Sequence, residues 1–162
     1  MATTHQEATA QDSETASASG ATAMLARHAA EARTKTFFKF TNAQEVHRGV
    51  AFHDGLVEDH VPFQTEHSCS AGGIYFCEEI DVLRWAPQYY GQLSEHGWVR
   101  SVTLPPDALV FNEGPDKWKA DKVLLGPRVP FHAWLRERSD LVLRSLVRHR
   151  DTHMVECVPT DM

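Results

Sequence analysis

Short apolar segments separated by Gly, Pro, Asn and Asp dominate the chain from residue 36 onward. The segments are rich in Val, Ile, Phe, Tyr and Trp, which favour β-strands, and the residues between them favour turns. The Asp54-Gly55 pair is a hairpin-type turn signal, and residues 56–71 are expected to form a long irregular connection. The pattern predicts strands over residues 36–41, 46–52, 73–77, 98–104, 108–111, 118–125 and 154–158.

Two segments with a helical spacing of apolar residues lie among these strands. Residues 79–90 place Ile80 and Leu83 near one face, and Pro87 is expected to end or kink that helix. Residues 131–150 form a longer C-terminal helical region. The order strands, helix, strands, helix predicts an α+β fold, with a small mixed or antiparallel sheet, a central helix and a C-terminal helical region.

The first residues of the chain differ in composition from the rest. Residues 1–20 are mostly Ala, Thr, Ser, Gln and Glu, and they contain no aromatic residue. They bury too little apolar surface to offset the entropy of ordering, so we expect a disordered tail. Residues 21–34 contain strong helix formers and predict a short lead-in helix. We expect one α+β domain over residues 35–150 and a C-terminal extension over residues 151–162.

Composition narrows the class of protein. The chain has 162 residues, a formal net charge of −6 and a sequence pI of about 5.9, which argues against nucleic acid as the partner. Three cysteines do not indicate a disulfide framework, and we expect reduced thiols. We see neither a membrane-spanning run nor a signal peptide, so we expect a cytoplasmic protein with no membrane partner. The expected partner is a protein of unknown identity, the oligomeric state stays open, and no cofactor is indicated.

Residues 69–77, Cys-Ser-Ala-Gly-Gly-Ile-Tyr-Phe-Cys, combine a small-residue turn with a buried-type strand. Gly72 and Gly73 allow positive φ or the close approach of another backbone. Tyr75 points to the opposite side of its strand from Ile74 and Phe76, and we expect it to be covered by packing rather than open to a pocket. We take Gly72, Gly73 and Tyr75, together with His53, as candidate binding residues.

Two kinds of reactive site were weighed. His67, Cys69 and Cys77 could supply metal ligands with His53 or His60, but no Cys-x₂-Cys spacing occurs, so we expect no metal site. Cys69 could act as a nucleophile only beside a base or a cation, and no histidine is placed there by the sequence. Motifs for a serine nucleophile, a phosphate-binding loop and a dinucleotide fingerprint are absent from the sequence, and catalytic residues stay unassigned.

The middle of the chain resembles an uncharacterised domain of giant DNA virus proteins, which often lies beside ankyrin repeats and has looser relatives in phage and bacterial proteins. The match runs from Phe37 to Gly126, and it implies no established activity. The motifs that carry it are Phe38-Lys39-Phe40-Thr41-Asn42, His47-Arg48-Gly49-Val50, His53-Asp54-Gly55-Leu56, Gly72-Gly73-Ile74-Tyr75-Phe76 and Lys117-Trp118-Lys119-Ala120-Asp121.

A more distant resemblance links the Gly-Ile-Tyr-Phe strand to ADP-ribosyltransferases, in which the matching tyrosine stacks on nicotinamide. Tyr75 would be that tyrosine, and Glu113 is a loose match to the catalytic glutamate of that family. The early Arg or His-Gly-Thr motif of the family is missing near Lys39. We therefore expect a non-catalytic intracellular interaction module, of the viral kind that the first resemblance implies and located in a host cytoplasm or a virion. The alternative is an NAD-using transferase.

Overall fold

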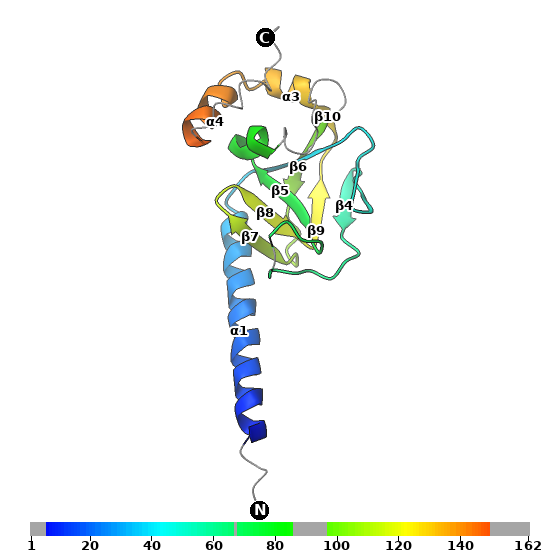
Figure 1. Cartoon of the computed structure of the whole chain (residues 1–162). Helices are drawn as coiled ribbons and strands as arrows, with labels where there is room; N and C mark the ends of the chain where they lie inside the picture. The colour runs from blue at the N-terminus through cyan, green and yellow to red at the C-terminus, as the bar shows by residue number, and fades with distance from the viewer. Residues whose placement is uncertain (1–5, 67, 86–96, 150–162) are drawn as a thin grey trace, which may run out of the picture.

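The computed structural model describes residues 6–66, 68–85 and 97–149, with side chains described from residue 19 onward. Its main sheet has the strand order β4-β9-β6-β1-β5-β8-β7, with β10 paired to β6, and every described ladder is antiparallel. Helices accompany this sheet at both ends (Figure 1), so the predicted α+β class is confirmed. The strands are β1 (Phe37–Thr41), β2 (Val46–His47), β3 (Val50–Ala51), β4 (Gly55–Glu58), β5 (Ile74–Glu78), β6 (Trp98–Thr103), β7 (Val110–Gly114), β8 (Lys117–Ala120), β9 (Lys122–Leu125) and β10 (Val129–Pro130).

The expected single strand over residues 46–52 is a tight hairpin instead. Strands β2 and β3 pair with each other, and Arg48 and Gly49 between them have φ values of 51° and 82°. Positive φ at two successive residues is the signature of a type I′ turn, which reverses the chain within two residues. The apolar pattern alone did not reveal this reversal, because only Gly49 is a turn residue there.

The expected strand over residues 118–125 is also divided, at Asp121. Strand β8 pairs with β5 and β7, whereas β9 pairs with β4 and β6 at the other side of the sheet. One predicted strand segment therefore supplies strands to both ends of the sheet. Its partner β4 lies inside the segment 56–71 that the sequence predicted as a loop, so that prediction was wrong for residues 56–58.

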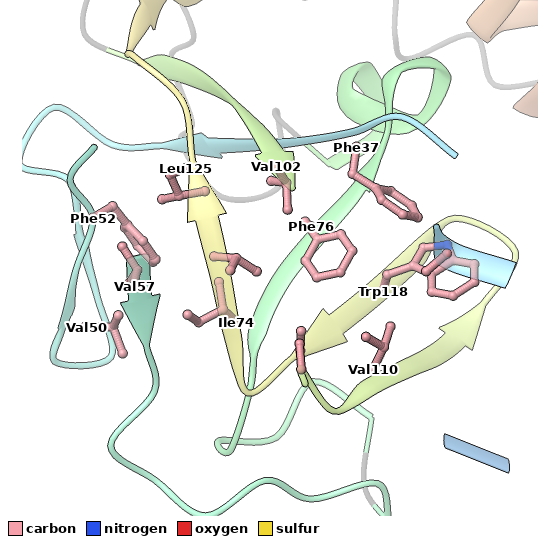
Figure 2. Packing of buried hydrophobic residues seen from close by; sticks show 14 of the residues in the cluster. Phe37, Val50, Phe52, Val57, Ile74, Phe76, Val102, Val110, Trp118 and Leu125 are labelled. Carbon is pink, nitrogen blue, oxygen red and sulfur yellow. The ribbon is translucent and has the colours of Figure 1, made fainter. Parts of the chain in front are cut away.

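The larger core lies on one face of the curved sheet. Phe37, Phe76 and Trp118 come from three neighbouring strands, and their rings pack edge to face or tilted at centroid distances of 4.9 and 5.3 Å (Figure 2). Val57 on β4 and Val110 on β7 join the same cluster, although their strands stand at opposite ends of the sheet order. The sheet must therefore curve around this cluster.

Helices cover the other face. Phe38 on β1 and Cys77 on β5 pack with residues of α3 (Phe131–Arg136) and α4 (Leu141–His149). The 3₁₀ turn η1 (Glu79–Asp81) leads into helical residues 82–85, and the rest of the helix expected over residues 79–90 lies outside the described part. Arg148 on α4 donates to the Asp81 carboxylate at 3.0 Å, which fastens α4 to η1. The expected strand over residues 154–158 and the extension over residues 151–162 also lie outside the described part.

The N-terminal helix is longer than the sequence predicted. Helix α1 runs from Gln6 to Ala32 and projects away from the sheet (Figure 1). The structure thus places residues 6–20 in a helix where we expected a disordered tail, because Ala, Gln and Glu favour helix even without a buried face. In the part of α1 whose side chains are described, the last turns pack: His28, Ala29 and Ala32 are buried, and the backbone N–H of Asn112 donates to His28 Nδ1 at 3.2 Å. No described helix has the length and apolar character of a membrane span.

Candidate functional site

The main sheet opens between β1 and β5. These strands pair only at Phe37 with Glu78 and at Phe38 with Cys77. From Phe76 back to Ile74, β5 pairs with β8 on its other edge. Where β1 and β5 separate, the Lys39 ammonium donates a hydrogen bond to the Tyr75 carbonyl at 2.9 Å. A lysine side chain thus occupies the gap where a backbone ladder would otherwise continue.

A cleft follows this opening and is lined by both aromatic and basic side chains. Its enclosed part measures about 80 Å³, roughly half the size of a cavity known to hold benzene, so only one group of a larger ligand fits inside. Arg48 and Ala71 at its wall are exposed, whereas Lys39 is buried. The basic residues are Lys39, His47, Arg48 and Lys117, and the aromatic residues are Phe38, Phe40, Phe52, Tyr75, Phe76 and Trp85.

Burial lowers the pKa of two basic groups of the cleft, Lys39 and His47. Burial lowers the pKa of Lys39 to about 8. Its Nζ lies 4.5 Å from the centre of the Phe52 ring, whose face is electrostatically negative. Burial, with the charges of Lys39 and Arg48, lowers the pKa of His47, so that imidazole is neutral near pH 7. Near neutral pH the cleft therefore presents three cations in a chain whose net charge is −6.

Asp59 is the acidic residue that lines the cleft, among the residues that the structure describes. Its Oδ2 accepts from the backbone N–H of Gly73 at 2.8 Å, and its Oδ1 accepts from the backbone N–H of Val61 at 2.9 Å. The carboxylate is therefore used to fix the loop before β5. It does not bind the basic side chains of the cleft in any described contact, so it does not neutralise their charge.

Tyr75 connects the cleft to a buried carboxylate behind it. Its ring lines the cleft, and its hydroxyl donates to Glu113 Oε1 at 2.7 Å. Lys117 Nζ lies 4.4 Å from the centre of that ring and 2.7 Å from Glu113 Oε2. Lys119, one pleat further along β8, reaches Glu113 Oε1 at 3.0 Å. One tyrosine and two lysines thus converge on a carboxylate whose side chain is 3% exposed.

The hydrogen bonds at Glu113 decide its charge. Burial alone would raise the pKa of this carboxyl, but hydrogen bonds from Lys117, Tyr75 and Lys119 lower it to about 2. Ser68 Oγ and the backbone N–H of Cys69 also donate to Glu113 Oε2, at 3.0 and 3.2 Å. Burial and the adjoining carboxylate raise the pKa of Tyr75 well above its ordinary value. Glu113 is therefore an ionised acceptor held by five donors, and it organises the wall of the cleft.

The structure separates the four predicted binding residues. Tyr75 and Gly73 line the cleft, so Tyr75 is not covered by packing as we expected. Gly72 lies behind it with φ 84°, and a Cβ on this residue would stand 2.3 Å from the Pro62 carbonyl oxygen. Its role is to let two backbones approach. His53 is exposed, contacts the Asp54 carbonyl through Nδ1 at 3.0 Å, and does not line the cleft.

The candidate metal ligands are not brought together. Cys69 is exposed, whereas Cys77 is buried on β5. Among the described residues, no group of three His, Cys, Asp or Glu side chains is placed to hold a metal ion. His67 lies outside that part. The cation that the sequence did not place beside Cys69 is Lys117, whose Nζ lies 2.7 Å from Cys69 Sγ.

The lysines of the site were not among the binding residues predicted from the sequence. Lys117 and Lys119 flank Trp118, the first residue of the strand predicted over residues 118–125, and period-two alternation puts both on the face opposite Trp118. This signal would have found them. Lys39 gives a weaker signal, because a lysine between two phenylalanines in a strand usually reaches solvent. Only the separation of β1 from β5 turns it inward.

Two mimivirus proteins resemble the chain. The putative ankyrin repeat protein R229 of Acanthamoeba polyphaga mimivirus is 33% identical over 110 residues, which are 59% of this chain and 34% of that protein. The chain thus spans about a third of that protein's length. Uncharacterized protein R869 of the same virus is 31% identical over 99 residues, which are 58% of this chain and 67% of that protein. No family model matches the chain, and no solved structure matches it significantly.

The match to R869 covers two thirds of that protein, and the chain therefore belongs to the same family as this giant-virus protein. The predicted resemblance to a giant-virus domain is confirmed to that extent. These matches do not show a relationship to ADP-ribosyltransferases.

Proposed function

We propose that the protein is a non-catalytic binding module, and that the cleft between β1 and β5 takes an anionic small molecule with a planar ring, of the nucleotide class. The observation that carries this proposal is the convergence of Lys39, Arg48 and Lys117 on one cleft in an acidic protein. A cleft with low-dielectric walls and charges of one sign focuses its field and attracts oppositely charged ligands.

The aromatic lining supports the ring of such a ligand. Tyr75, Phe40 and Trp85 offer flat apolar surfaces beside the cations. Small-molecule sites combine largely apolar walls with a few polar groups in this way. Because the enclosed space is small, one anionic or ring group enters and the remainder lies at the mouth, near exposed Arg48.

A non-catalytic role is supported by the state of Glu113. Five donors already occupy its two oxygens, and its side chain is 3% exposed. A carboxylate that accepts this many hydrogen bonds at a pKa of about 2 is a poor base near pH 7. Glu113 is instead suited to hold Tyr75 and Lys117 in position.

The second candidate is an NAD-using transferase of the ADP-ribosyltransferase type. It is favoured by one specific observation: a tyrosine on the cleft wall contacts both a cation and a carboxylate, through Lys117 and Glu113. In this case Glu113 would release one of its five hydrogen-bond donors and accept a hydrogen bond from a hydroxyl of the substrate instead. The expected location for either function is the cytoplasm of an infected cell or a virion, on the basis of the viral relatives. An unknown protein partner stays a prediction.

A thermal-shift screen separates these functions. The panel contains ATP, ADP-ribose, NAD, pyrophosphate and nicotinamide, because binding to the folded state raises Tm. We expect the nucleotides to raise Tm more than pyrophosphate or nicotinamide does, with no release of nicotinamide from NAD. Release of nicotinamide that Glu113→Gln abolishes would replace the binding module with the transferase. No shift with any member at millimolar concentration would contradict both.

A further inference from the structure

Cys69 and Lys117 lie unusually close together. The distance from Lys117 Nζ to Cys69 Sγ is 2.7 Å, which is at the short end even for hydrogen bonds to oxygen, a smaller atom than sulfur. The two residues are 48 positions apart in the sequence, in the loop before β5 and on β8. This proximity is therefore built by the tertiary fold.

Glu113 holds both partners in place. It accepts from Lys117 Nζ at 2.7 Å and from the backbone N–H of Cys69 at 3.2 Å, both at Oε2. The Lys117 side chain is 9% exposed, so its amine has little room to turn toward solvent. Arg48 adds a further restraint by donating to the Cys69 carbonyl at 2.8 Å. The sulfur and the nitrogen are thus fixed in contact.

Cys69 is placed to react with a small oxidant. The residue is exposed, so dissolved peroxide reaches its sulfur. The hydrogen bond from Lys117 lowers the pKa of Cys69, which favours the thiolate, and the thiolate is the form that peroxide oxidises. Cys77 differs in both respects, since it is buried and burial raises its pKa.

We propose that Cys69 and Lys117 are a modification site, at which hydrogen peroxide closes a covalent S–O–N bridge between the two side chains. In the first step the Cys69 thiolate attacks one peroxide oxygen, the O–O bond breaks, and the products are a sulfenic acid and hydroxide. The hydroxide takes a proton from the Lys117 ammonium and becomes water.

In the second step another peroxide oxidises the amine. The Lys117 nitrogen and the sulfenic oxygen each lose one hydrogen and form an O–N bond, while the second peroxide takes up these two hydrogens and is reduced to two waters. The thiolate, the ammonium and two peroxides thus give one neutral S–O–NH bridge and three waters. Sulfur and nitrogen are oxidised, and the peroxide oxygens are reduced.

The bridge would also change the cleft. Lys117 lines it, and its nitrogen loses its positive charge when it is bonded to oxygen. The oxidised protein is therefore expected to bind anions more weakly than the reduced protein. This consequence rests on the proposed function, whereas formation of the bridge does not.

Mass spectrometry tests the bridge directly, on the full chain in a Cys157→Ser background that prevents disulfides with that residue. After treatment with peroxide we expect a gain of about 14 Da, for one oxygen gained and two hydrogens lost. Tandem spectra of the digest should join the peptides that contain residues 69 and 117, and dithiothreitol should release them.

Two variants serve as controls. Lys117→Arg keeps the cation but lacks the primary amine, so it should stop at the sulfenic acid, a gain of about 16 Da. In Cys69→Ser, the peptide that contains residue 69 should gain neither mass. Sulfenic or sulfinic acid without a joined peptide in the wild type would overturn the proposal, as would the 14 Da product in Lys117→Arg. If Lys117→Arg does not fold, the joined peptide of the wild type decides alone. No ligand enters this measurement, so its outcome is independent of the proposed function.

Discussion

The Lys39 ammonium donates to the Tyr75 carbonyl at 2.9 Å, across the point where β1 and β5 part. This contact satisfies a backbone acceptor that has lost its strand partner on that edge. It also leaves a buried amine in the cleft with a pKa of about 8, close enough to neutrality to titrate in ordinary buffers. The separation of β1 from β5 therefore accounts both for the gap in the sheet and for the buried Lys39 charge in the cleft.

The affinity of the cleft for an anion is expected to fall as pH rises through about 8. Burial holds the pKa of Lys39 near 8, and the neutral amine above that pH no longer attracts the ligand. Loss of one proton gives at most about a tenfold decrease per pH unit. Titrations of ATP between about pH 7 and pH 9.5 measure this loss of affinity. His47 is already neutral in that range, so its charge does not change during the titration. In Lys39→Arg, which stays charged, the decrease should vanish; a decrease of the same size in that variant would contradict the assignment.

Glu113 is expected to stabilise the fold in a defined pH window. Its pKa is about 2 in the folded protein against an ordinary value of 4.5, so its stabilisation is complete above about pH 4.5 and is lost as pH falls toward 2. Relative to Glu113→Gln, the wild type should lose on the order of 2–3 kcal/mol of unfolding free energy across that window. Urea melts at several pH values measure the difference. Exposed Glu58 on β4 supplies the matched control, Glu58→Gln, which removes a carboxylate of the same sheet without touching the buried site.

Substitutions at Gly72 and Gly55 distinguish the energetic cost of a positive φ from the cost of a steric clash. Both have positive φ, 84° and 93°, but a Cβ at Gly72 would stand 2.3 Å from the Pro62 carbonyl oxygen, whereas nothing lies within 4 Å at Gly55. Gly55→Ala should therefore cost about 1–2 kcal/mol for its backbone conformation alone. Gly72→Ala should cost at least about 1 kcal/mol more, because backbone must move. Equal losses in denaturant melts would show that the loop relaxes freely.

Removal of residues 1–18 should leave Tm nearly unchanged. Among the side chains of α1 that are described, from residue 19 onward, burial begins at His28, and the removed segment has few core-forming side chains. Ala32→Asp is the contrasting variant, because Ala32 is 1% exposed within the larger core, and it should lower Tm by several degrees. A drop of that size on truncation would instead mean that the first turns of α1 dock on the domain.

The positions of the strands could be predicted from the sequence, but the interruptions within two of the predicted strands could not. The strand around Phe37 and the strand around Tyr75 were found because aromatic and β-branched residues dominate them. The breaks at Arg48 and Asp121 were missed because each carries a single turn residue, Gly49 or Asp121, within an otherwise strand-like segment, and tertiary pairing imposes the turns.

The same limit applies to the site. Tyr75 and Gly73 were identified from a local motif, and both line the cleft. Lys39 could not be assigned, because it joins Tyr75 only through the divergence of two strands that lie 36 positions apart. The function of Glu113 likewise depends on five donors that come from separate segments of the chain.

Calorimetric titration of ATP or ADP-ribose into two arginine variants tests the central claim most directly. Arg48→Gln removes an exposed cation at the cleft, and Arg136→Gln removes an exposed cation on α3 that does not line it. We predict saturable binding to the wild type, a loss of affinity of about tenfold in Arg48→Gln, equivalent to about 1.4 kcal/mol, and no change in Arg136→Gln. Equal affinity in both variants, or no binding to the wild type, would contradict an anion-binding cleft between β1 and β5.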